Sequence, residues 1–349
     1  MHGAFCQGLG LSRMLVEARE APSAVARLLD LGDTSYEAFG AILREVPPTG
    51  ILTLGRGSSD HAAQHTAYLI MARLGRLVTS LPMSLVTLYH ANLARPGLLV
   101  LAFSQSGQSP DLVDPMAYFT RNGATTVALV NDAASPLARE ASRVFPLRSG
   151  KERSVAATKS FIGQLVAGAR IVSAWEQDPA FAAGLQALPA ALEAAAHVDW
   201  SLGAKALVGV DRLFILGRGT GLAIASEAAL KLKETCGIQA EAFSGAEVRH
   251  GPMAIVEEGF PLLVFAPRGP AQAGLLALTH DLRLQGARVL LAAPPEVPGV
   301  DLPLIPAPHP ELDTVSAIQS FYPMVEALSR ARGFDPDHPP HLSKVTKTR

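Results

Sequence analysis

Two turns of the sequence are rich in serine and glycine in a way that suits the binding of a phosphate group. The first turn runs from Gly55 to Asp60, and the second runs from Ser104 to Ser109, directly before Pro110 and a predicted helix. Serine hydroxyls, backbone N–H groups and the positive end of a helix dipole together suit a dianionic phosphate. Because the same residues also form tight turns and helix N-caps, the pattern alone leaves a purely structural role open.

A lysine, a glutamate and a histidine further along the chain could carry acid–base chemistry. Lys231 and Glu234 are three residues apart in a predicted helix over 226–234, which places both on one face and turns Lys233 away. His250 stands directly before a Gly-Pro pair. Taken singly, the first two residues could form a surface ion pair and the histidine could end a turn, so both interpretations stay open.

The elements that position these residues belong to an internal duplication. Three segments recur in the same order, 162 or 163 positions later: Ile51–Ser58 as Leu213–Thr220, Leu98–Phe103 as Pro261–Ala266, and Asn122–Ala124 as Gln285–Ala287. Each copy consists of short apolar runs followed by a turn and a helical stretch. Because apolar runs without alternation are typical of strands buried on both faces, we predict an α/β fold of two tandem doubly wound, flavodoxin-like domains with parallel sheets covered by helices.

The second copy is an internal control for the serine-rich turns. Its counterpart of the turn Ser104–Ser109 is Pro267-Arg268-Gly269-Pro270, which contains no serine. The fold therefore does not require hydroxyl groups at this place, and the difference favours a function for the first copy. Neither turn has the lysine pattern of a P-loop or the third glycine of a dinucleotide fingerprint, so nucleotide binding is disfavoured.

The chain divides into four predicted regions: an N-terminal helical segment over 1–36, a first domain over 37–185, a second domain over 186–334 and a C-terminal tail over 335–349. The leading helix should run from Met14 to Leu31 with a break near Pro22. A helical bridge from Ala180 to Val198 should join the two copies. The tail is rich in proline where it begins, so we expect a loop there.

Composition excludes several classes of protein. With 349 residues, 48% apolar residues, 17% charged residues and a net charge of −1, the chain is neither disordered nor a strong binder of nucleic acid. Cys6 and Cys236 fit neither a disulfide framework nor a metal site, so no metal is expected. The start lacks the features of a signal peptide, and no apolar run reaches the length of a membrane span. We therefore expect a cytoplasmic protein that does not bind membranes.

Taken together, the motifs resemble those of the SIS-domain sugar isomerases, specifically the isomerase half of glucosamine-6-phosphate synthase and its stand-alone relatives. The likeness extends from about Glu17 to the tail. It rests on five motifs: "SQSG" at Ser104–Gly107, "VAATKSF" at Val155–Phe161, "ALKLKE" at Ala229–Glu234, "AEAFSGAEVRHGP" at Ala240–Pro252 and "LSKVT" at Leu342–Thr346. The resemblance implies a sugar phosphate as the small-molecule substrate and no cofactor.

The resemblance also implies roles for particular residues. Glu234 matches the base that moves a proton between C1 and C2 of the sugar, with Lys231 beside it. His250 matches a ring-opening histidine that reaches in from the neighbouring subunit, which implies a homodimer with shared active sites. Lys344 matches a C-terminal lysine that closes over the substrate. The phosphate and the sugar should be held by Ser58, Ser59, Ser104, Gln105, Ser106, Ser109 and Val155.

One departure from the synthase changes the expected activity. The synthase has a glutaminase domain with an N-terminal cysteine, whereas here Met1–Cys6 lead almost directly into the first predicted helix, so glutamine is not the expected ammonia donor. The wording "GRGSSDHA" and "VALVND" is closer to stand-alone glucosamine-6-phosphate deaminases. The resemblance thus implies the conversion of glucosamine 6-phosphate to fructose 6-phosphate and ammonia, by ring opening, C1/C2 proton transfer and imine hydrolysis.

Other functions stay open at this point. A deaminase, deglycase or aldose–ketose isomerase could act on a related compound, such as galactosamine 6-phosphate or a glycated amino acid. A protein of the same family could also sense a sugar phosphate without catalysis.

Overall fold

The computed structural model of the protein describes residues 10–30 and 32–344. Cys6, Leu31 and the end of the last motif, Val345 and Thr346, lie outside the described residues.

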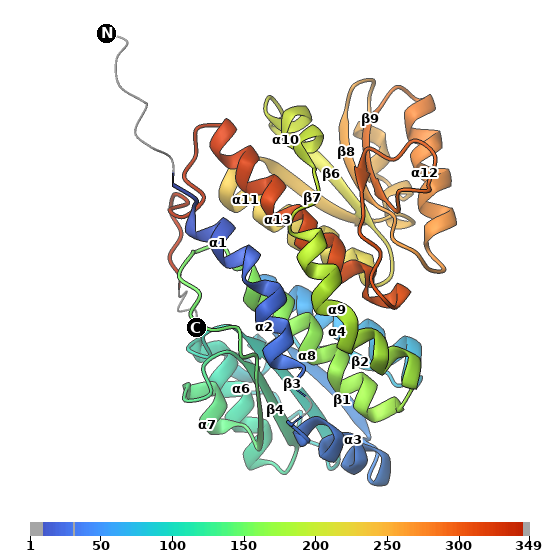
Figure 1. The fold of residues 1–349 in the computed structure, drawn as a ribbon. Helices are drawn as coiled ribbons and strands as arrows, with labels where there is room; N and C mark the ends of the chain where they lie inside the picture. Colours follow the sequence, from blue (N-terminus) through green and yellow to red (C-terminus); the bar gives the residue numbers. More distant parts are fainter. Residues whose placement is uncertain (1–9, 31, 345–349) are drawn as a thin grey trace.

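Two parallel five-stranded sheets form the frame of the molecule (Figure 1). The first sheet has the order β2-β1-β3-β4-β5. The second sheet, read from the edge at β7, has the order β7-β6-β8-β9-β10, so its strands follow the same order as their counterparts in the first sheet. This flavodoxin-like order confirms the predicted pair of doubly wound domains. The strands are β1 Gly50–Leu54, β2 Val78–Ser80, β3 Leu98–Ser104, β4 Thr125–Val130, β5 Arg143–Pro146, β6 Arg212–Gly217, β7 Gln239–Ser244, β8 Pro261–Phe265, β9 Arg288–Ala293 and β10 Leu302–Pro303.

Helices cover both faces of each sheet (Figure 1). The α-helices are α1 Arg13–Arg19, α2 Ala21–Leu28, α3 Ser35–Glu45, α4 Ser58–Leu74, α5 Ser84–Thr87, α6 Pro110–Arg121, α7 Pro136–Glu140, α8 Lys159–Glu176, α9 Pro179–Ala195, α10 Ser201–Leu207, α11 Thr220–Cys236, α12 Gln272–Leu284 and α13 Asp313–Ala331. Three short 3₁₀ helices are η1 Glu247–Arg249, η2 Pro252–Ile255 and η3 Pro310–Leu312. Among the described residues, no helix is both long and apolar enough to cross a membrane.

The two sheets share one central hydrophobic core. In β3, Leu99, Leu101 and Phe103 belong to this core, whereas Val100 and Ala102 belong to an outer core that includes side chains of α6. Strand β8 alternates in the same way between the central core and an outer core at α12. Because both faces of these strands are buried, they read in the sequence as unbroken apolar runs.

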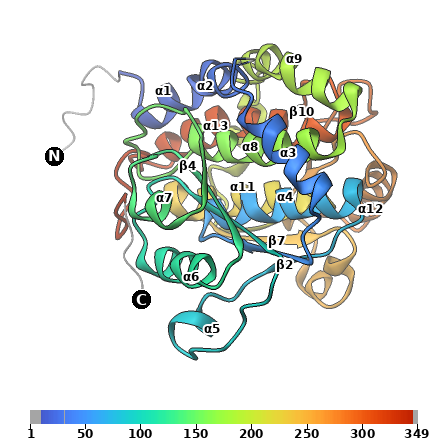
Figure 2. The ribbon, with the colours of Figure 1, turned by 90° about the horizontal axis from the view of Figure 1, so that it is seen from below.

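Four helices, α4, α8, α11 and α13, lie between the sheets and supply much of the central core (Figures 1 and 2). Helices α4 and α11 are counterparts in the duplication, and each has 17 residues. Leu230 of α11 lies beside Gly57, because a Cβ built on Gly57 would lie 3.8 Å from the Leu230 side chain. In the same way, a Cβ built on Gly219 would lie 3.4 Å from the ring of Tyr68 on α4. The two helices therefore pack about an approximate two-fold axis, each against the first turn of the other copy.

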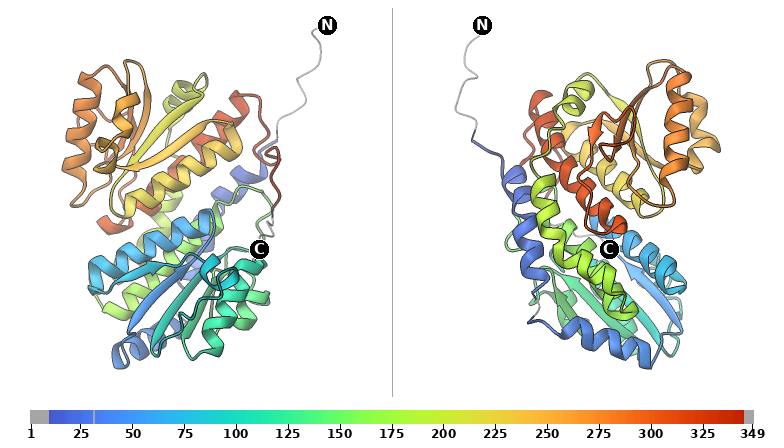
Figure 3. Two further views of the ribbon diagram at one scale, coloured as in Figure 1. Left: turned by 180° about the vertical axis from the view of Figure 1, so that it is seen from behind. Right: turned by 45° about the vertical axis from the view of Figure 1, so that its right-hand side comes forward.

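The segments outside the two copies also agree with the predicted elements. The leading helix is broken at Glu20 into α1 and α2, close to the predicted break at Pro22. Helix α9 provides the bridge between the copies, and the boundary predicted between residues 185 and 186 lies within it. The tail after α13 runs back along α1, where the Asp337 carboxylate accepts hydrogen bonds from the backbone N–H groups of Arg13 (2.8 Å) and Met14 (2.9 Å) (Figure 3).

Candidate active site

Helix α11 presents three charged side chains, Glu227, Lys231 and Glu234, on one face. The Nζ atom of Lys231 lies 2.5 Å from Oε2 of Glu234 and 3.6 Å from Oε1 of Glu227. Glu227 and Lys231 are buried, whereas 20% of the Glu234 side chain is exposed. Lys233 is exposed on another face, as the helical spacing predicts. An ammonium is thus held between two carboxylates, of which Glu234 is the more accessible.

Glu227 was not singled out from the sequence, yet it joins both copies at this place. Its carboxylate accepts a hydrogen bond from the Ser58 hydroxyl at 3.1 Å and from the Tyr322 hydroxyl at 3.4 Å, and its Oε2 lies 3.1 Å from Nδ1 of His61. Ser58 and His61 belong to the first turn of α4, and Tyr322 belongs to α13. The available signal was the spacing of Glu227 four residues before Lys231, which places it on the same helix face.

The charges of this cluster shift the pKa values of Lys231 and Tyr322. Burial lowers the pKa of the Lys231 ammonium, but the negative charges of Glu227 and Glu234 outweigh burial, so the pKa is raised and the lysine stays protonated. Burial, reinforced by the charge of Glu227, raises the pKa of the Tyr322 hydroxyl well above its usual value. Tyr322 therefore remains a hydrogen-bond donor to Glu227.

The serine-rich turn after β3 is compact and depends on one glycine. Gly107 has a φ of +62°, and a Cβ at this position would lie 2.2 Å from Oγ of Ser135, so only glycine fits without a shift of its neighbours. The N–H of Gly107 donates to the Ser104 hydroxyl oxygen at 2.9 Å, and the N–H of Gln108 donates to that of Ser106 at 3.4 Å. The turn ends at Ser109, the N-cap residue of α6. It faces the carboxyl end of the sheet, where ligands bind in this type of fold.

The turn after β1 lies at the neighbouring strand, because β1 and β3 are paired. The hydroxyl oxygen of Ser59 accepts a hydrogen bond from Nε2 of Gln164 on α8 at 3.0 Å. The hydroxyl of Ser58 donates to Glu227 instead, so its proton is engaged with that carboxylate in this conformation. The structure thus connects Ser58 to α11 and leaves Ser59 on the side of α8.

A second buried carboxylate, Glu152, connects the tail to the segment that carries Val155. Glu152 accepts hydrogen bonds from the N–H groups of Thr158 (2.9 Å) and Ser160 (3.2 Å) and from the Ser160 hydroxyl. Nζ of Lys344 lies 3.5 Å from its Oε2. Burial raises the pKa of Glu152, but the charge of Lys344 and these hydrogen bonds outweigh burial and lower it. Lys344 therefore lies over this segment, half-buried.

The two carboxylate clusters are within electrostatic reach of each other. The charge of Glu152 contributes to the raised pKa of Lys231 and to that of Tyr322. The segment before Val155, to which Lys344 of the tail is paired, therefore acts electrostatically on helix α11. Sequence reasoning missed Glu152 because nothing in the local pattern indicates that this carboxylate is buried.

His250 lies outside the cluster on α11 within the single chain. It caps the end of η1, where its own N–H donates to the carbonyl oxygen of Glu247 at 2.8 Å. Its side chain is exposed, and within residues 10–30 and 32–344 no hydrogen bond or ion pair joins it to α11.

The second copy has no comparable acid–base group at its counterpart of this site. Leu69 and Ala72 of α4 occupy the positions that Lys231 and Glu234 occupy on α11. The counterpart of Glu227 is His65, which is fully buried, and burial lowers the pKa of its imidazole to about 4. Among the described residues, the paired carboxylate and ammonium of this candidate site therefore lie on α11 and have no counterpart on α4.

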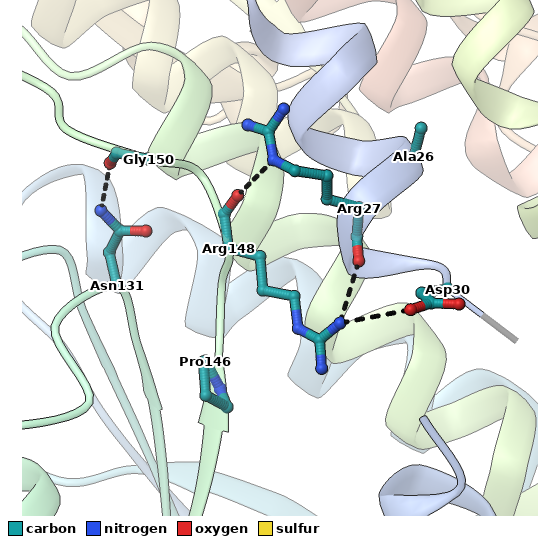
Figure 4. A pocket seen from close by; sticks show the side chains of 7 residues that line it. All are labelled: Ala26, Arg27, Asp30, Asn131, Pro146, Arg148 and Gly150. Carbon is teal, nitrogen blue, oxygen red and sulfur yellow. Dashed lines mark hydrogen bonds and ion pairs between the residues drawn. The ribbon is translucent and has the colours of Figure 1, made fainter. Parts of the chain in front are cut away.

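A cavity of about 790 Å³ lies beside Arg148 and Gly150, in the segment that precedes Glu152 (Figure 4). Figure 4 shows how its residues hold that segment: Nε of Arg27 donates to the carbonyl oxygen of Arg148 at 3.2 Å, and the Asn131 amide donates to that of Gly150 at 2.7 Å. None of the predicted site residues lines this cavity. Its lining consists of Ala26, Arg27, Asp30, Asn131, Pro146, Arg148 and Gly150.

The described residues contain no group of three or more His, Cys, Asp or Glu side chains placed to hold a metal ion.

Comparison with known proteins assigns the fold to a family. The SIS domain profile matches residues 48–174 and 206–293, which fall in the two copies. The chain belongs to the SIS domain family. Glutamine–fructose-6-phosphate aminotransferases [isomerizing] from Sulfolobus acidocaldarius and Aeropyrum pernix are 30% and 32% identical to this SIS protein, and each alignment covers 95% of this chain. The chain spans 56% of the length of these two relatives.

Solved structures show the same SIS architecture. The crystal structure of a "putative phosphosugar isomerase" from Silicibacter pomeroyi is 43% identical, covers 94% of this chain with all of its own, and superposes with a TM-score of 0.88. Glucosamine-6-phosphate deaminase from Thermotoga maritima has a TM-score of 0.75 over 97% of this chain and all of its own. Because its identity is 21%, that likeness concerns the fold alone.

Proposed function

We propose that this SIS protein is a glucosamine-6-phosphate deaminase, which converts glucosamine 6-phosphate and water to fructose 6-phosphate and ammonia. The observation that carries the proposal is the Lys231–Glu234 pair, backed by the buried Glu227 and joined to the first turn of α4 beside the serine-rich turns. An accessible carboxylate next to a fixed ammonium suits the removal of a proton from carbon beside a carbonyl group.

In the proposed reaction, Glu234 takes the proton from C2 of the open-chain sugar. The electrons of the C2–H bond form a C1=C2 double bond, and the aldehyde oxygen takes a proton from the substrate's own C2 ammonium group, which gives an enaminol. Glu234 then returns its proton to C1, which leaves a protonated imine at C2. Water adds to that imine and ammonia leaves as ammonium, so that fructose 6-phosphate remains. The Lys231 ammonium stabilises the negative charge that develops on the oxygen.

Residues from outside this cluster complete the proposed site. The serine hydroxyls and N–H groups of the two turns bind the phosphate of the substrate. Lys344, held over the segment of Val155 by Glu152, closes the tail over the sugar and excludes bulk water. Because the His250 side chain does not reach this cluster within its own chain, we propose that His250 opens the sugar ring in the site of a partner subunit, in a homodimer.

The direct test mixes the purified protein with glucosamine 6-phosphate and measures both products, ammonia and fructose 6-phosphate. We expect equal amounts of both, and we expect Glu234→Gln to lower kcat by about 10² to 10⁴, the range for loss of a positioned base. Ammonia release no greater than that of Glu234→Gln contradicts the deaminase assignment. Interconversion of fructose 6-phosphate and glucose 6-phosphate without ammonia release from the amino sugar indicates an isomerase instead.

A further inference from the structure

His61 is a polar residue next to the candidate site to which no role has yet been assigned. It lies in the first turn of α4, directly after the serine-rich turn of β1, and 17% of its side chain is exposed. Nδ1 of its ring lies 3.1 Å from Oε2 of Glu227. An ionised carboxylate can only accept hydrogen bonds, so Nδ1 carries the proton in this contact. His61 therefore donates from the first copy to a fully buried anion of the second.

The hydrogen bonds divide the two carboxylates beside Lys231 into two kinds. Glu227 is fully buried and receives donors on both oxygens, from Ser58 and Tyr322 on Oε1 and from His61 on Oε2. Glu234 is partly exposed, and in the described part of the chain its recorded hydrogen-bond donor is Lys231. These donors fix the orientation of the Glu227 carboxylate, whereas Glu234 keeps an accessible face from which it can reach a substrate.

The loss of the His61 donor would change this division. Oε2 of Glu227 would then be buried without a hydrogen bond, which costs free energy. The Glu227 carboxylate would turn toward Lys231 and draw the ammonium away from Glu234. This change would weaken the proposed base without altering the serine-rich turn after β3.

We propose that His61 is a positioning residue of this site, whose Nδ1–H fixes the Glu227 carboxylate beside Lys231 and so keeps the Lys231 ammonium against Glu234. This proposal rests on the proposed function, because it assumes that Glu234 is the base. It assigns His61 no contact with the substrate. It explains why a histidine of the first copy is directed at the catalytic helix of the second.

The experiment compares His61→Ala with His61→Asn, because the asparagine amide can donate from nearly the same place as Nδ1. The matched control is Gln64→Ala, on the same helix, whose amide bonds to Asp60 rather than to Glu227. We expect His61→Ala to lower kcat by about 10- to 100-fold with KM within about twofold, and His61→Asn to recover most of the loss. Gln64→Ala should behave as the unaltered protein.

A second readout separates this proposal from the proposed function. Exchange of a C1 hydrogen of fructose 6-phosphate for solvent deuterium requires proton abstraction but no amine, and we expect His61→Ala to slow it as much as it lowers kcat. If the unaltered protein exchanges this hydrogen but releases no ammonia, the deaminase assignment is wrong and the His61 proposal is still decided by the exchange rates. If it does neither, both are wrong.

Three results overturn the role of His61. They are an exchange rate of His61→Ala equal to that of the unaltered protein, an equal loss in His61→Asn and His61→Ala, and a rise in KM with kcat preserved. Melting temperatures of all variants show whether each is folded. If His61→Ala does not fold, His61→Leu replaces it, because leucine fills the space of the ring but donates no hydrogen bond.

Discussion

Lys231 is a buried ammonium held between two carboxylates of its own helix, and its neighbours rather than its exposure decide its charge. Only 1% of the side chain is exposed, yet the charges of Glu227 and Glu234 keep it protonated. A buried ion pair costs desolvation free energy that its attraction barely returns. Such an arrangement is therefore better explained by chemistry at this site than by a contribution to folding.

Removal of the Lys231 charge should be costly at the residue scale. We expect Lys231→Met to lower the free energy of unfolding by about 3–5 kcal/mol, because it leaves Glu227 buried without its cation. The matched control, Lys233→Met, changes an exposed lysine of the same helix and should stay within about 0.5 kcal/mol. Urea denaturation followed by circular dichroism measures both values. Equal effects of the two substitutions would contradict the ion-pair geometry.

At the scale of elements, the serine-rich turn after β3 depends on the backbone conformation of Gly107. Its positive φ brings its N–H to the Ser104 oxygen, and its missing side chain leaves room for Ser135 of the next loop. Gly123, at the end of α6, also has a positive φ, but an added Cβ there would meet nothing within 4 Å. A substitution at Gly123 therefore tests backbone strain alone, whereas a substitution at Gly107 adds a steric contact with Ser135.

This contrast predicts different outcomes for the two alanine variants. Gly107→Ala should weaken the binding of fructose 6-phosphate by at least about tenfold, because the turn must open to relieve the contact with Ser135. Gly123→Ala should cost about 1 kcal/mol of stability through strain alone and leave binding unchanged. Isothermal titration calorimetry gives the two dissociation constants. Unchanged affinity in Gly107→Ala would show that this turn does not hold the sugar phosphate.

At the scale of the whole molecule, the two copies of the duplication carry different parts of the proposed site. The first copy retains the serine-rich turns, whereas the second supplies Glu227, Lys231 and Glu234. On α4 the corresponding places hold a histidine, a leucine and an alanine, so the approximate two-fold axis relates a cluster of two carboxylates and an ammonium to a place with one buried imidazole. His250 lies apart from both, which is why the proposed site requires a second chain.

The proposed sharing of His250 between subunits makes a prediction for mixed dimers. Glu234→Gln and His250→Ala should each be nearly inactive alone. When the two variants are unfolded together and refolded, each mixed dimer should contain one intact site, and about a quarter of the original activity should return for random pairing. Ammonia release measures the recovery. No recovery in dimers shown to be mixed, or a monomer in sedimentation equilibrium, would contradict a shared site.

The main elements and part of the site follow from local patterns in the sequence. Helical spacing places Lys231 and Glu234 on one face, because residues three apart lie on the same side of a helix. The repeat and its apolar runs predict two parallel sheets, because strands buried on both faces lack an alternation of polar and apolar residues. The serine-rich turns follow from their places after buried strands. The roles of Ser58, Ser59, Ser104, Gln105, Ser106, Ser109 and Val155 in binding stay predictions.

The partners of the buried charges were decided by the tertiary structure alone. The partners of Glu227 are Ser58 and His61 of α4 and Tyr322 of α13. These residues lie 95 to 169 positions away in the chain, so the sequence around Glu227 does not indicate them. Glu152 becomes a buried anion only when the tail lies over it. Because the partners of a side chain depend on everything that surrounds it in space, the sequence by itself indicated that Lys231 and Glu234 share a helix face, and packing of the two copies determined which groups contact Glu227.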